Sequence, residues 1–309
     1  MAEPVTARGF REHFTAWADG RAKRLPVWRT FGMQAVRADD DGATIRLPLE
    51  PFLLDARGRL PAGVVAVLAD SAVGCSLAVA MERADFARPS VTVTLTLEPT
   101  VEELPTSGHL ECTGRLIARH EPHVLMAADV RDEAGRQVAE VRAWFNLLVG
   151  RVAEPISWDD PDEGFGEDPG PLDGPDAGLG PIGNHLGLIR ADGSADGART
   201  DGARSQAPGA RLRLRSRPGF CNRLRTLHGG VGALIADLAA GAALGGERYQ
   251  PLTATYSYLR TTGRVGQIVN VEAEVVKPGR AVAMAESRVL TADGRVALHA
   301  VVNADVAPR

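Results

Sequence analysis

Several features are scarce in this 309-residue sequence, and each absence excludes a class of protein. Its three cysteines, Cys75, Cys112 and Cys221, lack the paired or CxxC spacing of a disulfide framework or a thiolate metal site. The net charge is −4 and Lys and Arg form no cluster, which excludes the electrostatic surface of a nucleic-acid-binding protein. At 5%, the aromatic content gives no sign of stacked-ring binding. These absences favour a protein of a reducing cytosol that binds a small neutral or anionic molecule.

We expect neither an export signal nor a membrane span. Residues 1–28 carry scattered charges and have no apolar core, so we expect a cytoplasmic protein. The segments Gly63–Met81 and Leu227–Gly246 are apolar and about long enough to cross a bilayer. Each has an aspartate in its middle, Asp70 or Asp237, is rich in Ala and Gly, and is followed by strands that alternate as in soluble proteins. These patterns predict two buried central helices.

The two helices belong to a repeated unit. The stretch GVVAVLADSAVGCSLA (Gly63–Ala78) aligns without gaps with GVGALIADLAAGAALG (Gly230–Gly245), and eight of the sixteen positions are identical. Alternating stretches precede each helix (ATIRLPLE and ARLRLRS) and follow it (SVTVTLTLEP and LTATYSYLR). Two further long strand candidates come next in each half. The sequence therefore predicts a duplication of a strand, a long helix and three or four antiparallel strands.

This pattern predicts an α+β protein in which each antiparallel sheet curves around its own central helix. We place the first domain at residues 1–150 and the second at 184–309. The acidic, Pro- and Gly-rich residues 151–183 are expected to form an extended, mobile linker. Residues 191–210 lack large apolar side chains and are predicted to be a disordered loop within a hairpin. GLGPIG at 178–183 matches GxGxxG, but no strand precedes it, so it is not interpreted as a nucleotide site.

The aspartates are placed to act between helices. His228 and Asp237 are nine residues apart, about 13 Å and half a revolution along one helix, so they cannot reach one reacting atom. An antiparallel partner helix would bring its own mid-point to this N-terminus, and the duplication supplies such a helix with Asp70. Either aspartate could instead be a purely structural carboxylate, hydrogen-bonded to a neighbour because unpartnered burial is costly.

The second helix opens with His228, Gly229 and Gly230. Amides at a helix N-terminus lack intrahelical acceptors and lie at the positive end of the dipole, so they can bind a carbonyl oxygen that gains charge. Glycine also permits close approach of a ligand. The alternative is that the glycines only end a loop and that the histidine is a capping residue.

These residues resemble a known family. The pattern Asn222-x5-His228-Gly229-Gly230-x6-Asp237, with the following alternating strand and a late VVKPGR strand, resembles the hotdog-fold thioesterases of the PaaI type. The similarity covers both halves, which implies a tandem (double) hotdog. It implies hydrolysis of an acyl-CoA, with coenzyme A present only as part of the substrate. In that family an Asn side chain and the first glycine amide polarise the thioester carbonyl, and an acidic residue of the opposite helix attacks it or activates water.

Carried over residue by residue, the resemblance implies one complete site and one degenerate site. The catalytic residues of the complete site would be Asp70, Asn222, His228 and Gly229; Gly230 would help to bind the substrate, and Ser90, Thr92 and Thr94 would hold water. In the first half, Asp55, Pro61 and Ala62 stand at the positions of Asn222, His228 and Gly229. Proline has no N–H and Asp55 would repel an oxyanion, so the site of Asp237 is predicted to be weak or silent.

Other assignments follow from the chemistry of single stretches. Lys277 and Arg280 could meet the CoA phosphates, or could be an exposed pair beside a turn. The histidines show no metal-ligand spacing, and HEPH at 120–123 is predicted to be a bend between strands. A non-catalytic acyl-CoA-binding protein and a hotdog hydratase or dehydratase remain alternatives. Two such chains are compatible with a homodimer, and no membrane or nucleic-acid partner is expected.

Overall fold

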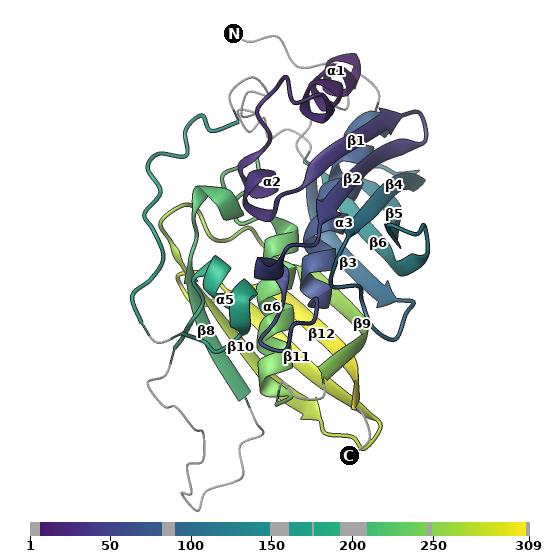
Figure 1. The fold of residues 1–309 in the computed structure, drawn as a ribbon. Coiled ribbons are helices and arrows are strands. Elements are labelled where there is room, and N and C mark those ends of the chain that lie inside the picture. The colour runs from purple at the N-terminus through teal and green to yellow at the C-terminus, as the bar shows by residue number, and fades with distance from the viewer. Residues whose placement is uncertain are drawn as a thin grey trace, which may run out of the picture.

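Two central helices lie on the concave side of one large sheet (Figure 1). The computed structural model describes residues 7–81, 90–148, 161–174, 176–191, 209–245 and 249–306. The central helices are α3 (Ala62–Ala80) and α6 (Gly229–Ala243). Short 3-10 turns, η1 (Pro51–Leu53) and η2 (Pro218–Phe220), precede them.

A single 12-stranded antiparallel sheet runs through the molecule in the order β1-β2-β4-β5-β6-β3-β9-β12-β11-β10-β8-β7. The strands are β1 (Gln34–Asp39), β2 (Gly42–Pro48), β3 (Ser90–Pro99), β4 (His109–His120), β5 (His123–Asp132), β6 (Gln137–Leu147), β7 (Ile189–Arg190), β8 (Gly209–Arg215), β9 (Tyr249–Tyr258), β10 (Ile268–Lys277), β11 (Val282–Leu290) and β12 (Val296–Val306). The two halves of the chain supply mirrored strand orders and join where β3 pairs with β9, for example at Leu95 and Tyr256. The expected antiparallel sheet is confirmed, but the sheet is continuous, because the strand after each helix pairs with its counterpart.

The central helices pack against each other through glycine. A Cβ at Gly63 would lie 2.5 Å from Leu234 Cα, and one at Gly230 would lie 2.5 Å from Val67 Cα. Only glycine permits backbones to approach this closely. The segment Ala62–Ala80 is long and apolar enough to span a membrane by composition, with a mean hydropathy of 1.9. In the structure it is almost entirely buried, since helix and sheet surround it, and its composition is that of a core helix.

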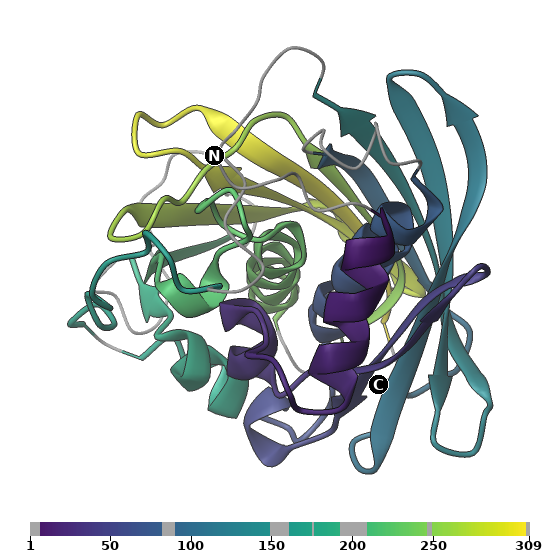
Figure 2. The same cartoon turned by 90° about the horizontal axis from the view of Figure 1, so that it is seen from above.

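Two further helices, which no sequence pattern predicted, lie near the N-terminus: α1 (Ala7–Ala18) and α2 (Pro26–Phe31). Phe14 and Trp17 of α1 pack on Trp28 of α2, with ring centroids 6.1 and 5.3 Å apart respectively. These helices lie on the same side of the sheet as α3 and α6 (Figure 2). The low aromatic content therefore concealed a local aromatic cluster.

The predicted linker is not extended throughout. It contains part of α5 (Gly180–Leu186), whose Ile182 N–H donates to Leu54 O at 3.0 Å beside η1. Both α2 and α5 begin near a proline and end at a glycine with left-handed φ, at 75° for Gly32 and 68° for Gly187. The duplication thus extends to these helices, and GLGPIG opens α5. Residues 151–160 and Pro175 of the linker lie outside the described residues.

The other sequence predictions about loops have mixed outcomes. The HEPH stretch is confirmed as the bend between β4 and β5, where His120 pairs with His123. β7 and β8 pair as the hairpin around the predicted loop, but residues 192–208 of that loop lie outside the described residues.

Candidate active site

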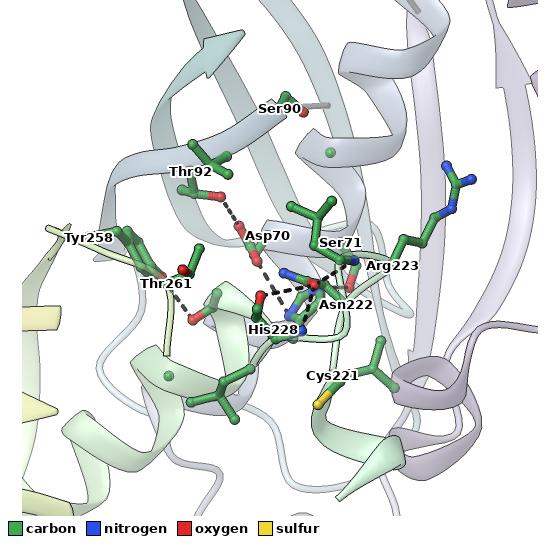
Figure 3. A pocket seen from close by; sticks show the side chains of 18 of the residues that line it. Asp70, Ser71, Ser90, Thr92, Cys221, Asn222, Arg223, His228, Tyr258 and Thr261 are labelled. Atoms are coloured by element: carbon green, nitrogen blue, oxygen red, sulfur yellow. Dashed lines mark hydrogen bonds and ion pairs between the residues drawn. The ribbon is translucent and has the colours of Figure 1, made fainter. Parts of the chain in front are cut away.

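Asp70 of α3 meets the N-terminus of α6. Its Oδ2 accepts a hydrogen bond from the Gly230 N–H at 2.8 Å, and its Oδ1 accepts one from the Thr92 hydroxyl at 2.9 Å (Figure 3). The carboxylate is 6% exposed, so it is held by both helices and by β3 with little contact to solvent. The structure thus brings together Asp70, Gly230 and Thr92, as the argument from two antiparallel helices requires.

His228 is the N-cap of α6. Its Nδ1 accepts from the Gly230 N–H at 3.2 Å and lies 3.4 Å from Asp70 Oδ2, while its Nε2 lies 3.5 Å from the Ser71 hydroxyl. Burial lowers the pKa of His228, and the nearby Asp70 carboxylate opposes this effect. The imidazole is therefore neutral. Its Nδ1 caps α6 by accepting from the Gly230 N–H, and its Nε2 lies next to the Ser71 hydroxyl.

Two residues that line the space beside Asp70, Gly229 and Asn222, carry hydrogen-bond donors. The N–H of Gly229, the first residue of α6, has no acceptor among the described residues, and Gly229 lines the cavity. Asn222 holds its own loop, since its Oδ1 accepts from the N–H groups of Leu224 at 2.9 Å and Thr226 at 3.3 Å. Its Nδ2 finds no acceptor in the described part of the chain. An amide N–H and an amide NH₂ are the donors that a developing oxyanion needs.

Tyr258 supports this helix start and was missed by sequence reasoning. Its hydroxyl donates to Gly229 O at 2.9 Å, and burial raises its pKa well above the usual range. The peptide that accepts this bond carries the Gly230 N–H that binds Asp70. Because polarisation through a peptide strengthens linked hydrogen bonds, Tyr258 supports the hold on Asp70. The one sequence signal for this role of Tyr258 is its position as the last residue of an alternating strand.

A cavity of about 710 Å³ opens beside these groups. Asp70, Ser90, Thr92, Asn222, His228 and Gly229 all line it. The apolar part of its wall comes mainly from α1, α2, α3, β3 and β6. This size suits a small-molecule ligand.

Thr94, predicted to hold water with Ser90 and Thr92, does not line the cavity. The register of β3 shifts between Thr92, opposite the buried Phe145, and Thr94, opposite the exposed Trp144. Opposite residues of an antiparallel pair share a face, so the bulge at Val93 places Thr94 on the outer face. A strict alternation could not reveal this bulge.

Lys277 and Arg280, assigned to the CoA phosphates, are exposed and do not line the cavity either. β10 begins at Ile268, paired with Arg215 near the start of α6, and then runs for about 30 Å away from it. The cations that line the cavity in the described part of the chain are Arg223 and Arg260. Burial lowers the pKa of Arg223 to about 10.

The corresponding place in the first half is closed. Asp237 Oδ2 accepts from the Gly63 N–H at 2.9 Å, and its Oδ1 accepts from the Tyr249 hydroxyl. Asp237 is 0% exposed, and burial raises its pKa from 3.8 to about 6, with Asp55 adding to the rise while the Tyr249 and Gly63 hydrogen bonds oppose it. Pro61 caps the helix without a side-chain hydrogen bond. Tyr249 was not foreseen as the partner of Asp237.

Metal sites have no candidate in the ranges described above, where no three His, Cys, Asp or Glu side chains are grouped to hold an ion. The site combines a carboxylate held by two hydrogen bonds with two hydrogen-bond donors on residues that line the same cavity.

Comparison with known proteins gives matches at the level of structure. No protein-family model and no curated protein sequence matches the chain. A tesB protein from Mycobacterium avium subs. paratuberculosis superposes with a TM-score of 0.60 at 11% identity, over 91% of this chain and 98% of that one. An acyl-CoA thioesterase II, TesB2, from Mycobacterium marinum gives 0.56 at 12%, over 92% and 98%. A protein of unknown function with a hotdog fold from Alicyclobacillus acidocaldarius gives 0.57 at 12%, over 88% and 96%.

The chain has a hotdog fold. Its structural neighbours include thioesterases of the TesB type. At these identities the likeness establishes the fold alone, so the function of this hotdog chain is argued from its site.

Proposed function

We propose that the chain is an acyl-CoA thioesterase of the PaaI type, built from two hotdog domains in tandem at residues 1–150 and 184–309. The mirrored strand orders, the paired central helices and the repeat of α2 in α5 support this division. Residues 151–183 would connect the domains. Thioesterases among the structural neighbours support the same class of activity.

The thioester carbonyl would be bound at the start of α6. Its oxygen accepts from the Gly229 N–H and from Asn222 Nδ2, both at the positive end of the helix dipole. This pair of donors stabilises the negative charge that develops when the carbonyl carbon is attacked, an effect of about 3 kcal/mol for one such donor.

Asp70 acts as the general base. It removes a proton from a water molecule whose oxygen bonds to the carbonyl carbon, and the tetrahedral intermediate then collapses with cleavage of the C–S bond. The CoA thiolate leaves and takes the proton from Asp70, which returns the carboxylate to its starting state. Thr92 and the Gly230 N–H hold the carboxylate in place through these steps. Capture of an acyl-Asp70 anhydride by hydroxylamine would instead make Asp70 the nucleophile.

One observation carries the proposal: Asp70 of one central helix and Gly229, the first residue of the other, line the same cavity. The test is release of free thiol from a panel of acyl-CoAs. Thiol release supports the thioesterase. Tight binding of acyl-CoA without release would indicate a binding protein, and loss of enoyl-CoA absorbance without release would indicate a hydratase.

A further inference from the structure

The two central helices carry equivalent glycines with different surroundings. Gly74 follows Asp70 by one turn in α3, and Gly241 follows Asp237 by one turn in α6. A Cβ at Gly241 would lie 3.2 Å from Cδ1 of the Tyr249 ring, whereas a Cβ at Gly74 would meet nothing within 4 Å. In the second half a phenol ring therefore fills the space that is open in the first half, and its hydroxyl binds the aspartate.

The bulges of the two strands show which residues correspond. β3 has its bulge between Thr92 and Thr94, and β9 has its bulge between Pro251 and Thr253. Counted back from the bulges, Ser90 occupies the position of Tyr249. A small side chain in place of tyrosine leaves room over Gly74 for a ligand group.

The space over Gly74 continues into an apolar region that we call the α3 chamber, lined by Leu77, Met81, Val27, Trp28 and Phe145. All five side chains are buried, with Trp28 only 1% exposed. From Asp70 to Met81 the chamber follows α3 for about 16 Å. Its length and composition suit an apolar chain.

The opposite side of the cavity has the features of an entrance. Tyr258 and Thr261 lie on one side of Asp70 and Arg223 on the other (Figure 3). Beyond Tyr258 the cavity is lined by Leu259, which is 58% exposed, and by the exposed Arg260. A positive charge at an exposed rim suits a phosphate-bearing group.

We propose that the acyl group lies in the α3 chamber over Gly74, that Trp28 in the chamber wall limits the acyl length, and that the pantetheine arm leaves past Tyr258 toward Arg260. The preferred substrates are then thioesters of medium-length apolar acyl groups. This inference rests on the proposed thioesterase function.

A matched pair of helical glycines tests the direction of the acyl group. Gly74→Ala adds a methyl group to the chamber, and Gly232→Ala adds one on the other side, where the new Cβ would lie 3.3 Å from Leu298 Cδ1. Alanine favours a helix over glycine, so both variants should fold. We expect Gly74→Ala to lower kcat/KM for dodecanoyl-CoA about tenfold relative to acetyl-CoA. Gly232→Ala should change kcat/KM by the same factor for every acyl length.

Trp28 is tested against its neighbour. Trp28→Leu should enlarge the chamber and raise kcat/KM for palmitoyl-CoA about tenfold relative to octanoyl-CoA. Trp17→Leu makes the same substitution in the same aromatic cluster, but Trp17 does not line the cavity. It should leave the acyl-length profile unchanged.

The inference is wrong if Gly232→Ala alters the dependence of kcat/KM on acyl length and Gly74→Ala does not. It is also wrong if both tryptophan variants alter this dependence equally. If the wild-type protein hydrolyses none of the acyl-CoAs, the proposed function fails. Binding of the same acyl-CoAs to the same variants, measured by calorimetry, then still decides where the acyl group lies.

Discussion

The two places where a central-helix aspartate meets the other helix share a backbone frame but differ in side chains. Asp70 accepts from Gly230 N–H at 2.8 Å, and Asp237 accepts from Gly63 N–H at 2.9 Å. The first aspartate has a threonine partner and an open cavity, whereas the second has a tyrosine partner and is fully buried. The difference shows that helix crossing alone positions the carboxylate, while a few neighbouring side chains decide whether a substrate can reach it.

The largest expected effect separates the two aspartates. Asp70→Asn removes the base and should lower kcat by about 10³-fold. Asp237→Asn removes a carboxylate that no substrate reaches and should leave kcat near that of wild type. Both are measured by thiol release with one acyl-CoA. A larger loss for Asp237→Asn would reverse the assignment of the active half.

The next effect gives the proposed active site the acidic residue that stands at the same position in the first half. Asp55 Oδ1 accepts from Arg57 N–H at 2.8 Å and Arg59 N–H at 2.9 Å, just as Asn222 holds the amides two and four residues further on. Asn222→Asp should therefore preserve the loop but place a negative charge beside the developing oxyanion. We expect kcat to fall about 10²-fold, with an unchanged melting temperature. Wild-type activity in this variant would remove Asn222 from the site.

The dependence of stability on pH reports on Asp237. The pKa of Asp237 is raised by burial from 3.8 to about 6, so its contribution to stability is present at low pH and is lost as the pH rises through about 6. The rise of the Asp237 pKa from 3.8 to about 6 corresponds to roughly 3 kcal/mol in the free energy of unfolding. Relative to wild type, the free energy of unfolding of Asp237→Asn should rise by this amount between pH of about 4 and 6, measured by urea denaturation. A constant difference across this window would contradict the raised pKa.

The smallest effect concerns Tyr258. Its hydrogen bond to the start of α6 has no counterpart in the first half among the described residues. Tyr258→Phe removes the bond to Gly229 O, worth about 1 kcal/mol, and should lower kcat about fivefold. Thr255→Val, on the same strand but outside the cavity lining, is the control. Equal losses in both variants would show that Tyr258 acts only through the strand.

The sequence was informative where a pattern repeats and uninformative where one residue changes the register. The aligned helices and their aspartates predicted the crossing of α3 and α6, since identical spacing requires identical geometry. The bulge at Val93 leaves no pattern in the sequence, so Thr94 was wrongly placed on the inner face of β3. The direction of β10 leaves none either, so Lys277 and Arg280 were wrongly placed at the cavity. Tyr249 and Tyr258 reach their partners only through tertiary packing, which a strand pattern does not encode.

Asp70 and Gly229, the two sides of the proposed reacting centre, belong to one polypeptide whose halves join where β3 pairs with β9. A centre shared between separate subunits loses its parts on dilution, because each part is supplied by a different molecule. Here the tether keeps the partner at a fixed effective concentration. The turnover number should consequently stay the same however dilute the enzyme becomes.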